Sequence, residues 1–130
     1  MDNKAFYELF EKGKLVLPEG EKNFADLPWN PHKKFEGVEL KHIVTSEDTG
    51  GAYSYHLIRV APGKSIGEHS HHNQVETHEV IAGKGTCING GAEYEYEPGC
   101  VTIFRADTVH QVIAGDEGVM VFAKFFPALK

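Results

Sequence analysis

Short runs of alternating apolar and polar residues recur from Val38 toward the end of this chain. Each run is bounded by Gly, Pro, Asn or Asp, which is typical of β-strands joined by tight turns. Asn89-Gly90 lies between two such runs and favours a two-residue hairpin, because both residues accept positive φ. Many short strands with regular turns predict an all-β jelly roll. We expect strands over residues 38–45, 52–60, 76–81, 85–88, 92–96, 100–104, 109–113 and 118–126.

The start of the chain shows a helical pattern instead. Residues 2–11 place Phe6, Leu9 and Phe10 at the spacing of one helix face, and Gly13 follows as a stop signal. This pattern predicts a short amphipathic helix, which must cover its apolar face against another part of the molecule or against a partner.

A strap rich in Pro and Gly follows the predicted helix. Residues 14–34 fit no regular period, so we expect an irregular segment with one or two short extended pieces, anchored by Trp29. We therefore divide the chain in two. Residues 1–34 form the helix and the Pro-rich strap, which pack on the barrel or on a partner subunit, and residues 35–130 form the barrel.

Composition and charge narrow the class of protein. The 130 residues are 41% hydrophobic, which is typical of one globular domain and not of a disordered chain. A net charge of -6, with no basic cluster beyond Lys33-Lys34, argues against a nucleic-acid partner. We see neither a membrane-spanning apolar run nor a signal-peptide pattern, so we expect a cytoplasmic protein with no membrane partner. Cys87 and Cys100 lack a metal-binding spacing, and we assign them no function.

Three histidines and one glutamate have spacings that suit a single metal ion. His69 and His71 are two residues apart, so in an extended strand both imidazoles lie on the same side. The residues after His71 allow a short turn that brings a strand starting at Glu76 back beside the first. A later patterned stretch, residues 99–112, ends with His110, and closure of the sheet would bring this imidazole across to complete the set. The sequence therefore predicts one metal site made of His69, His71, Glu76 and His110.

The donor atoms of this predicted site limit the choice of metal. Three imidazoles and one carboxylate suit one divalent transition-metal ion per chain, either Fe, Mn, Ni, Co, Cu or Zn, and they exclude a calcium-type site. Four protein ligands leave about two coordination positions open for a substrate or dioxygen. Because the strands bury a core of their own, we expect the ion to serve function more than stability.

His78 is a further candidate because it shares a strand face with Glu76 by alternation. If Glu76 points into the barrel, His78 does so too. It would then orient a metal ligand through a hydrogen bond, or act as a general base toward a bound substrate. An interior histidine that is hydrogen-bonded and has no chemical role fits the pattern equally well.

The strand with Tyr53, Tyr55 and His56 lies next to the predicted site in the expected barrel. One parity of this strand should line the cavity, and the sequence does not choose between the two parities. Phe104, Phe122 and Phe125 are expected in the core rather than against a substrate.

Two stretches of the chain resemble the motifs of the cupin family. Residues 63–83 match every defining position of the first motif, Gly-x5-His-x-His-x3 or 4-Glu-x6-Gly. Residues 99–110 resemble the second motif in its glycine and histidine, whereas Arg105 and Asp107 replace its proline and second glycine, and Ala114 stands where asparagine is common. These departures affect a turn and leave the ligand positions intact. With the flanking strands the resemblance covers roughly residues 35–126.

The resemblance implies a small double-stranded β-helix barrel that binds a small molecule. As an enzyme, such a protein would use its metal for dioxygenase, isomerase, epimerase, decarboxylase or lyase chemistry. A non-catalytic small-molecule binding or sensing cupin is the alternative, because fold alone does not fix chemistry. A metal-free sugar-nucleotide epimerase is disfavoured, because the ligand set is complete. We also expect a homodimer, since a small barrel with an apolar helix often pairs and homodimers are the commonest assembly.

Overall fold

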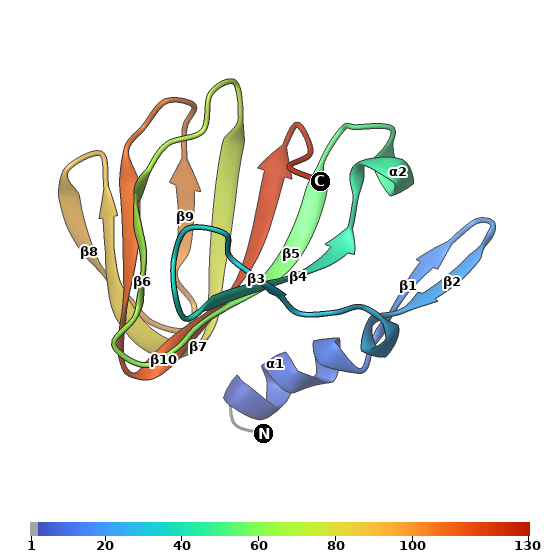
Figure 1. Cartoon of the computed structure of the whole chain (residues 1–130), viewed down its shortest axis with the longest axis horizontal. Coiled ribbons are helices and arrows are strands. Elements are labelled where there is room, and N and C mark those ends of the chain that lie inside the picture. Colours follow the sequence, from blue (N-terminus) through green and yellow to red (C-terminus); the bar gives the residue numbers. More distant parts are fainter. Residues whose placement is uncertain (1–2) are drawn as a thin grey trace.

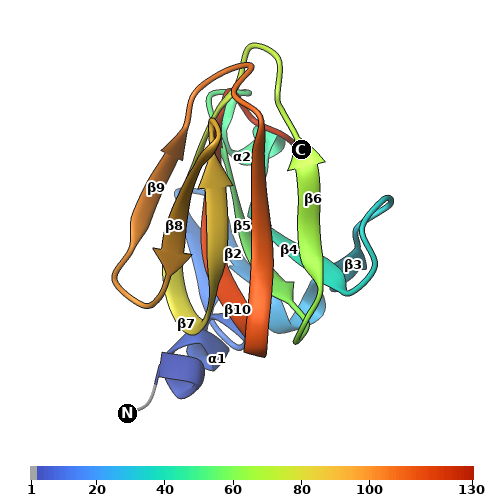
Figure 2. The ribbon, with the colours of Figure 1, turned by 90° about the vertical axis from the view of Figure 1, so that its left-hand side faces the viewer.

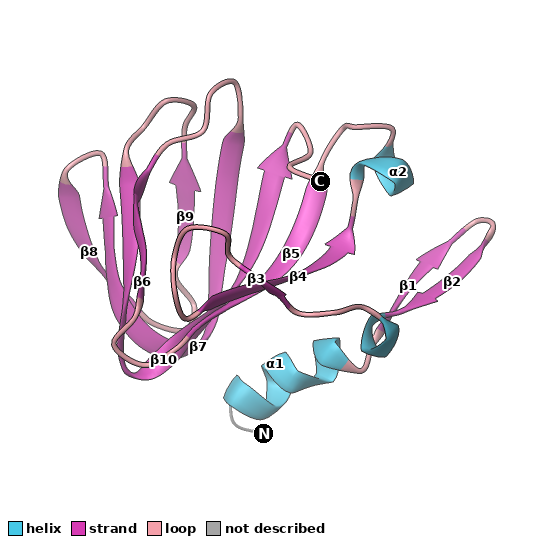
Figure 3. Ribbon diagram, viewed as in Figure 1, coloured by secondary structure: helices cyan, strands magenta, loops and turns pink. Residues whose placement is uncertain are grey.

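The computed structural model describes residues 3–130, and these residues form a β-barrel with a helix and a hairpin outside it (Figures 1 and 3). The predicted all-β jelly roll with a short N-terminal helix is confirmed. The elements in chain order are α1 (Asn3–Glu11), β1 (Lys14–Leu17), β2 (Gly20–Asn23), a 3-10 turn (Phe24–Asp26), β3 (Asn30–Pro31), β4 (Val38–Val44), α2 (Ser46–Thr49), β5 (Ser54–Val60), β6 (Ser65–His69), β7 (Val75–Asn89), β8 (Ala92–Tyr96), β9 (Val101–Phe104) and β10 (His110–Phe126).

Two long antiparallel strands, β7 and β10, belong to both sheets of the barrel (Figure 2). The first half of β7 pairs with the second half of β10 and with β9. The second half of β7 pairs with the first half of β10 and with β8. Strands β5, β4 and β3 extend the first sheet, and β6 extends the second. The barrel is therefore two sheets that share their two longest strands.

The division of these long strands into shorter ones was predicted wrongly. Residues 76–81 and 85–88 belong to the single strand β7, and residues 109–113 and 118–126 belong to the single strand β10. Gly83 and Gly118, both at positive φ, lie where the two strands bend together. A Cβ on Gly83 would overlap the carbonyl oxygen of Gly118. The glycines that looked like turn residues therefore form a bend inside continuous strands.

The sequence also wrongly predicted that the strand before the turn at His71 pairs with the strand that starts at Glu76. Strand β6 ends at His69 and pairs with β10, whereas β7 starts in the opposite sheet. The connection that contains His71 therefore crosses from one sheet to the other at one end of the barrel (Figure 1). A hairpin would place the two strands side by side in one sheet. A barrel made of two sheets closes only if some connections cross from one sheet to the other.

Two apolar clusters lie on the two faces of the first sheet. One fills the barrel between the sheets, and the other lies between the outer face of the sheet and α1. Tyr7 of α1 is fully buried and donates a hydrogen bond of 2.9 Å to the carbonyl of Ile58. Trp29 packs against the outer cluster with the Arg59 guanidinium 3.9 Å from its ring centroid, so it anchors the strap as expected.

The start of the predicted helix at residue 2 lies outside the described residues, and α1 is described from Asn3. Between residues 3 and 130, no helix has the length and apolar character needed to cross a membrane.

Candidate metal centre

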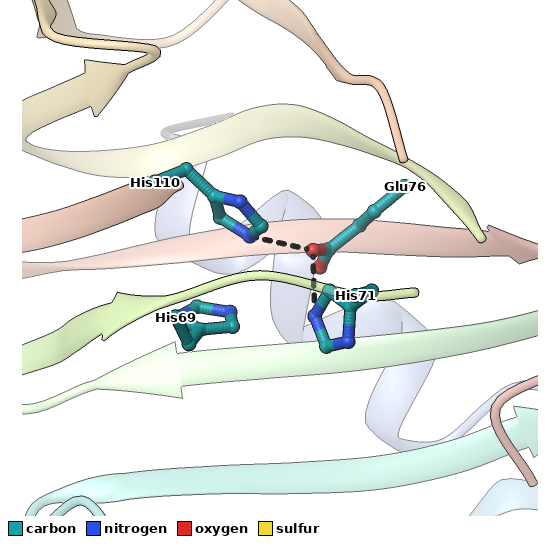
Figure 4. A group of neighbouring side chains, drawn as sticks. All are labelled: His69, His71, Glu76 and His110. Carbon is teal, nitrogen blue, oxygen red and sulfur yellow. Dashed lines mark hydrogen bonds and ion pairs between the residues drawn. The ribbon is translucent and has the colours of Figure 1, made fainter. Parts of the chain in front are cut away.

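The four predicted ligands meet at one end of the barrel, carried by three segments (Figure 4). His69 is the last residue of β6, His71 follows it in the connection to β7, Glu76 is near the start of β7, and His110 begins β10. The pairing of β10 with β6 places His110 opposite His69. One ligand atom from each of the four residues lies within 4.8 Å of the others, an arrangement compatible with one metal ion.

Glu76 is the acidic centre of this cluster and is only 3% exposed. Its Oε2 accepts a hydrogen bond of 2.8 Å from His78 Nε2, and its Oε1 lies 3.1 Å from His110 Nε2. Burial alone would raise the pKa of the Glu76 carboxyl, but the neighbouring imidazoles outweigh burial and hold this pKa well below its usual value. The carboxyl is therefore ionised and needs positive charge close by.

Hydrogen bonds to the backbone fix the tautomers of two of the histidines. His69 Nδ1 lies 2.7 Å from the carbonyl of Gly67, and His110 Nδ1 lies 2.9 Å from the carbonyl of Thr108. A carbonyl only accepts, so each Nδ1 carries a proton and each neutral ring presents a lone pair at Nε2. Burial lowers the pKa of His69 to about 4, so this ring is neutral at neutral pH.

His110 Nε2 lies 3.1 Å from Glu76 Oε1, and a carboxylate only accepts, so a neutral His110 ring with its proton on Nδ1 would set two acceptors against each other. Either a second proton on His110 or a cation between the two atoms removes the conflict. His71 Nε2 lies 3.4 Å from Glu76 Oε1 but is not aligned for a hydrogen bond, and this buried nitrogen has no hydrogen-bond partner among residues 3–130. An unpartnered buried nitrogen is costly. A transition-metal ion fits the nitrogen and oxygen atoms that converge here.

His78 lies on the same face of β7 as Glu76, as alternation predicts. Because a carboxylate only accepts, His78 Nε2 donates to Glu76. Its Nδ1 lies 3.0 Å from the hydroxyl of Tyr96, and burial is the main reason that the pKa of this tyrosine is raised. The tyrosine therefore stays protonated and can donate to His78, so both nitrogens of His78 are engaged.

Two aromatic residues that were predicted only as core also hold the ligand rings in place. Phe104 stacks on His110 with the ring centroids 4.0 Å apart and the planes 10° apart. Phe125 meets His71 edge to face with the centroids 5.1 Å apart. These contacts restrict rotation of both imidazoles, which keeps their nitrogens aimed at Glu76.

A cavity of about 110 Å³ lies beside the cluster. His32 from the strap and Leu129 from the C-terminal segment contribute to its wall. Sequence reasoning missed both residues, because no local pattern connects them with the histidine motif. The remaining wall is formed by His69, His71, Glu76, His78, Val38, Leu40, Ile58, Ile66 and Phe125.

Burial shows which alternate residues of β5 face the interior of the barrel. Ser54 and His56 point into the barrel, whereas Tyr55 packs with Phe122 on the outer side. His56 is fully buried, with Nε2 at 2.7 Å from Ser54 Oγ and Nδ1 at 2.7 Å from His42 Nδ1. Burial, with a further contribution from His42, lowers the pKa of His56 to about 3.

The buried neutral state of His56 predicts that acid destabilises the protein. An unfolded histidine titrates near pH 6.5, so between pH 6.5 and about pH 3 only the unfolded state takes up this proton. Stability is therefore lost as the pH falls, by about 2 kcal/mol between pH 7 and pH 5 for this residue. Urea unfolding of the metal-free protein at both pH values should show a smaller loss in His56→Gln. The same loss in both proteins would contradict this account.

Comparison with known proteins places the chain in a family. The family described as "Cupin domain" matches residues 56–125. No curated protein matches the chain.

Several solved structures share the fold. A protein described as a predicted oxalate decarboxylase from Thermotoga maritima is 19% identical, with a TM-score of 0.72 over 79% of this chain and 95% of that one. Ectoine synthase from P. lautus is 21% identical, with a TM-score of 0.66 over 73% and 67%. The polyketide cyclase RemF from Streptomyces resistomycificus is 16% identical, with a TM-score of 0.69 over 79% and 75%. At these identities the likeness shows the fold alone, and it is the family match over more than half of the chain that shows this protein to be a member of the cupin family.

Proposed function

We propose that this cupin binds one divalent transition-metal ion through His69, His71, Glu76 and His110. The observation that carries the proposal is the convergence of an ionised buried carboxylate, the Nε2 lone pairs of two histidines and the unpartnered Nε2 of a third. These donors suit Fe, Mn, Ni, Co, Cu or Zn. About two coordination positions would remain for another molecule.

The protein would act as a small metalloenzyme on a small organic molecule in the barrel. A bound ion of this kind supplies Lewis acidity toward substrate oxygens, or a site for dioxygen. The chain itself contributes a small cavity with a partly apolar wall beside the ligands, and a carboxylate that His78 holds in place. The solved structures of similar fold include a predicted decarboxylase, a synthase and a cyclase, so they do not select one reaction type.

Turnover distinguishes this enzyme from a non-catalytic binding or sensing cupin. The metal-loaded protein is incubated with a metabolite mixture with and without oxygen, and the mixture is analysed by mass spectrometry. An enzyme depletes at least one compound and forms a product, and Glu76→Gln abolishes that conversion. If a compound binds to the protein and is returned unchanged under both conditions, the binding function replaces the enzymatic one.

His78 would act as a positioning residue that orients the Glu76 carboxylate. The general-base role is disfavoured, because both of its nitrogens are engaged and its side chain is buried. Loss of a group that orients a ligand typically costs about 10-fold to 100-fold in metal affinity. Titration calorimetry with Co(II) should show such a loss for His78→Phe and a smaller one for His78→Gln, whose amide still donates to Glu76. Unchanged affinity in His78→Phe would contradict the positioning role.

The homodimer remains a prediction that rests on α1. Its residues Phe6 and Leu9 are 42% and 53% exposed, and they border an apolar groove with Phe24 and Tyr55. Light scattering at micromolar concentration should give twice the mass of the chain. A monomeric mass would contradict the prediction.

A further inference from the structure

The loop of residues 32–37, between β3 and β4, packs closely against β6. The ring of Phe35 lies against Gly67, where an added Cβ would come within 2.7 Å of the ring. The same ring is 5.9 Å from the ring of His69, measured between centroids. The loop can therefore lie on β6 only because residue 67 has no side chain, and this contact holds the loop beside the candidate metal ligands.

His32 in this loop has its protonation state set by the backbone. Its Nδ1 accepts hydrogen bonds from the amides of Lys34 and Phe35, at 3.0 and 3.2 Å. Burial lowers the pKa of His32, and the nearby Lys34 and His71 add to this effect, so the ring is neutral and carries its single proton on Nε2. Within residues 3–130 no group accepts a hydrogen bond from this Nε2.

His32 also lines the cavity beside the metal centre. Among the described residues that line this wall, it is the only polar side chain apart from the metal-centre residues and His78, and the others are aliphatic or aromatic. The volume of about 110 Å³ equals the space of roughly four water molecules. The cavity wall therefore combines aliphatic and aromatic residues with one histidine outside the ligand cluster, and the free proton of that histidine is on Nε2.

The charge around this donor favours an anion. Lys33 and Lys34 follow His32, and they form the one basic cluster in a chain whose net charge is -6. The carboxylate of the neighbouring Glu36 pairs with Lys64, with Oε1 3.6 Å from Nζ. The approach to His32 is therefore locally positive, although the protein as a whole is acidic.

We infer that His32 is a substrate-binding residue and that the substrate is a small carboxylate with a short aliphatic body. The carboxylate would accept a hydrogen bond from His32 Nε2 and place an oxygen at the metal centre, with the aliphatic part against Leu40, Ile58 and Leu129. This inference rests on the proposed metal centre. A neutral analogue of the same shape would lose both the charge and one hydrogen bond.

Binding to the Co(II)-loaded protein tests this inference without measuring turnover. Calorimetry compares 2-oxobutanoate with 2-butanone, which keeps the carbonyl and the short tail but lacks the carboxylate. We expect the acid to bind with a Kd below about 1 mM and the ketone to bind at least about 10-fold more weakly. His32→Asn keeps a side-chain oxygen that can accept from the loop amides but cannot reach the cavity, and it should weaken acid binding about 10-fold. His72→Asn, at an exposed histidine, should leave acid binding unchanged.

The outcomes separate the two proposals. Failure of the wild-type protein to bind Co(II) would overturn the metal centre, and this inference with it. Co(II) binding without binding of 2-oxobutanoate, or with equal affinity for 2-butanone, would overturn the substrate class alone. Equal acid affinity in His32→Asn and wild type, at equal cobalt content and thermal unfolding midpoint, would overturn the role of His32.

Discussion

His69→Ala and His71→Ala are each expected to weaken metal binding by more than about 100-fold while the barrel stays folded. Each substitution removes one of the imidazoles around the buried Glu76 carboxylate. Both side chains are only partly buried, and the strands bury their own apolar core, so the fold does not depend on either ring. Calorimetric titration with Co(II), together with circular dichroism, measures both parts of this expectation.

His72→Ala is the matched control for the loss of metal binding. This histidine follows His71 directly, but its side chain is 78% exposed and pairs with Asp107 at 3.0 Å. Its removal should leave the Co(II) affinity within about 2-fold of wild type. Full metal content in His69→Ala and His71→Ala, or an equal loss in His72→Ala, would show that the ion is bound elsewhere.

Gly83→Ala is expected to destabilise the protein by about 3 kcal/mol or more, the largest effect on stability that we predict. Gly83 has a φ of 78°, a conformation that L side chains rarely adopt. Its added Cβ would also overlap the backbone of Gly118, where β7 and β10 bend together. Backbone strain and backbone overlap therefore add at this position. Urea unfolding measures the difference from wild type.

Gly91→Ala separates these two causes. Gly91 also has a positive φ, of 88°, but a Cβ there meets no atom within 4 Å. Its cost should therefore be the backbone strain alone, about 1 to 2 kcal/mol. If Gly83→Ala costs no more than Gly91→Ala, the tight bend between β7 and β10 is not a constraint on the fold.

The candidate metal centre could be predicted from the sequence because its signal is local. His69, His71 and Glu76 lie within eight residues of one another, and the alternation of a strand was enough to add His78. His32 could not be found in this way. It reaches the site through the contact of Phe35 with Gly67, which joins two segments that share no sequence pattern.

The strands were predicted more reliably than their connections. Apolar alternation and the flanking turn residues located β4, β5 and β8 to within two residues. The same reasoning divided β7 and β10 each into two predicted strands at their glycines. A glycine in a sequence is equally compatible with a turn between strands and with a bend inside one strand. Partner choice depends on closure of the whole barrel, so the pairing of β6 with β10 was not readable from the turn after His71.

X-ray absorption spectroscopy of the Co(II)-loaded protein tests the proposed metal centre most directly, because the scattering of imidazole rings identifies histidine ligands. The proposed site predicts about one cobalt per chain with three imidazole nitrogens and at least one oxygen in its first coordination sphere. The matched sample of His69→Ala should lose one imidazole from the signal of any cobalt it retains. A spectrum without imidazole scattering in the wild-type protein would contradict the metal centre built from His69, His71, Glu76 and His110.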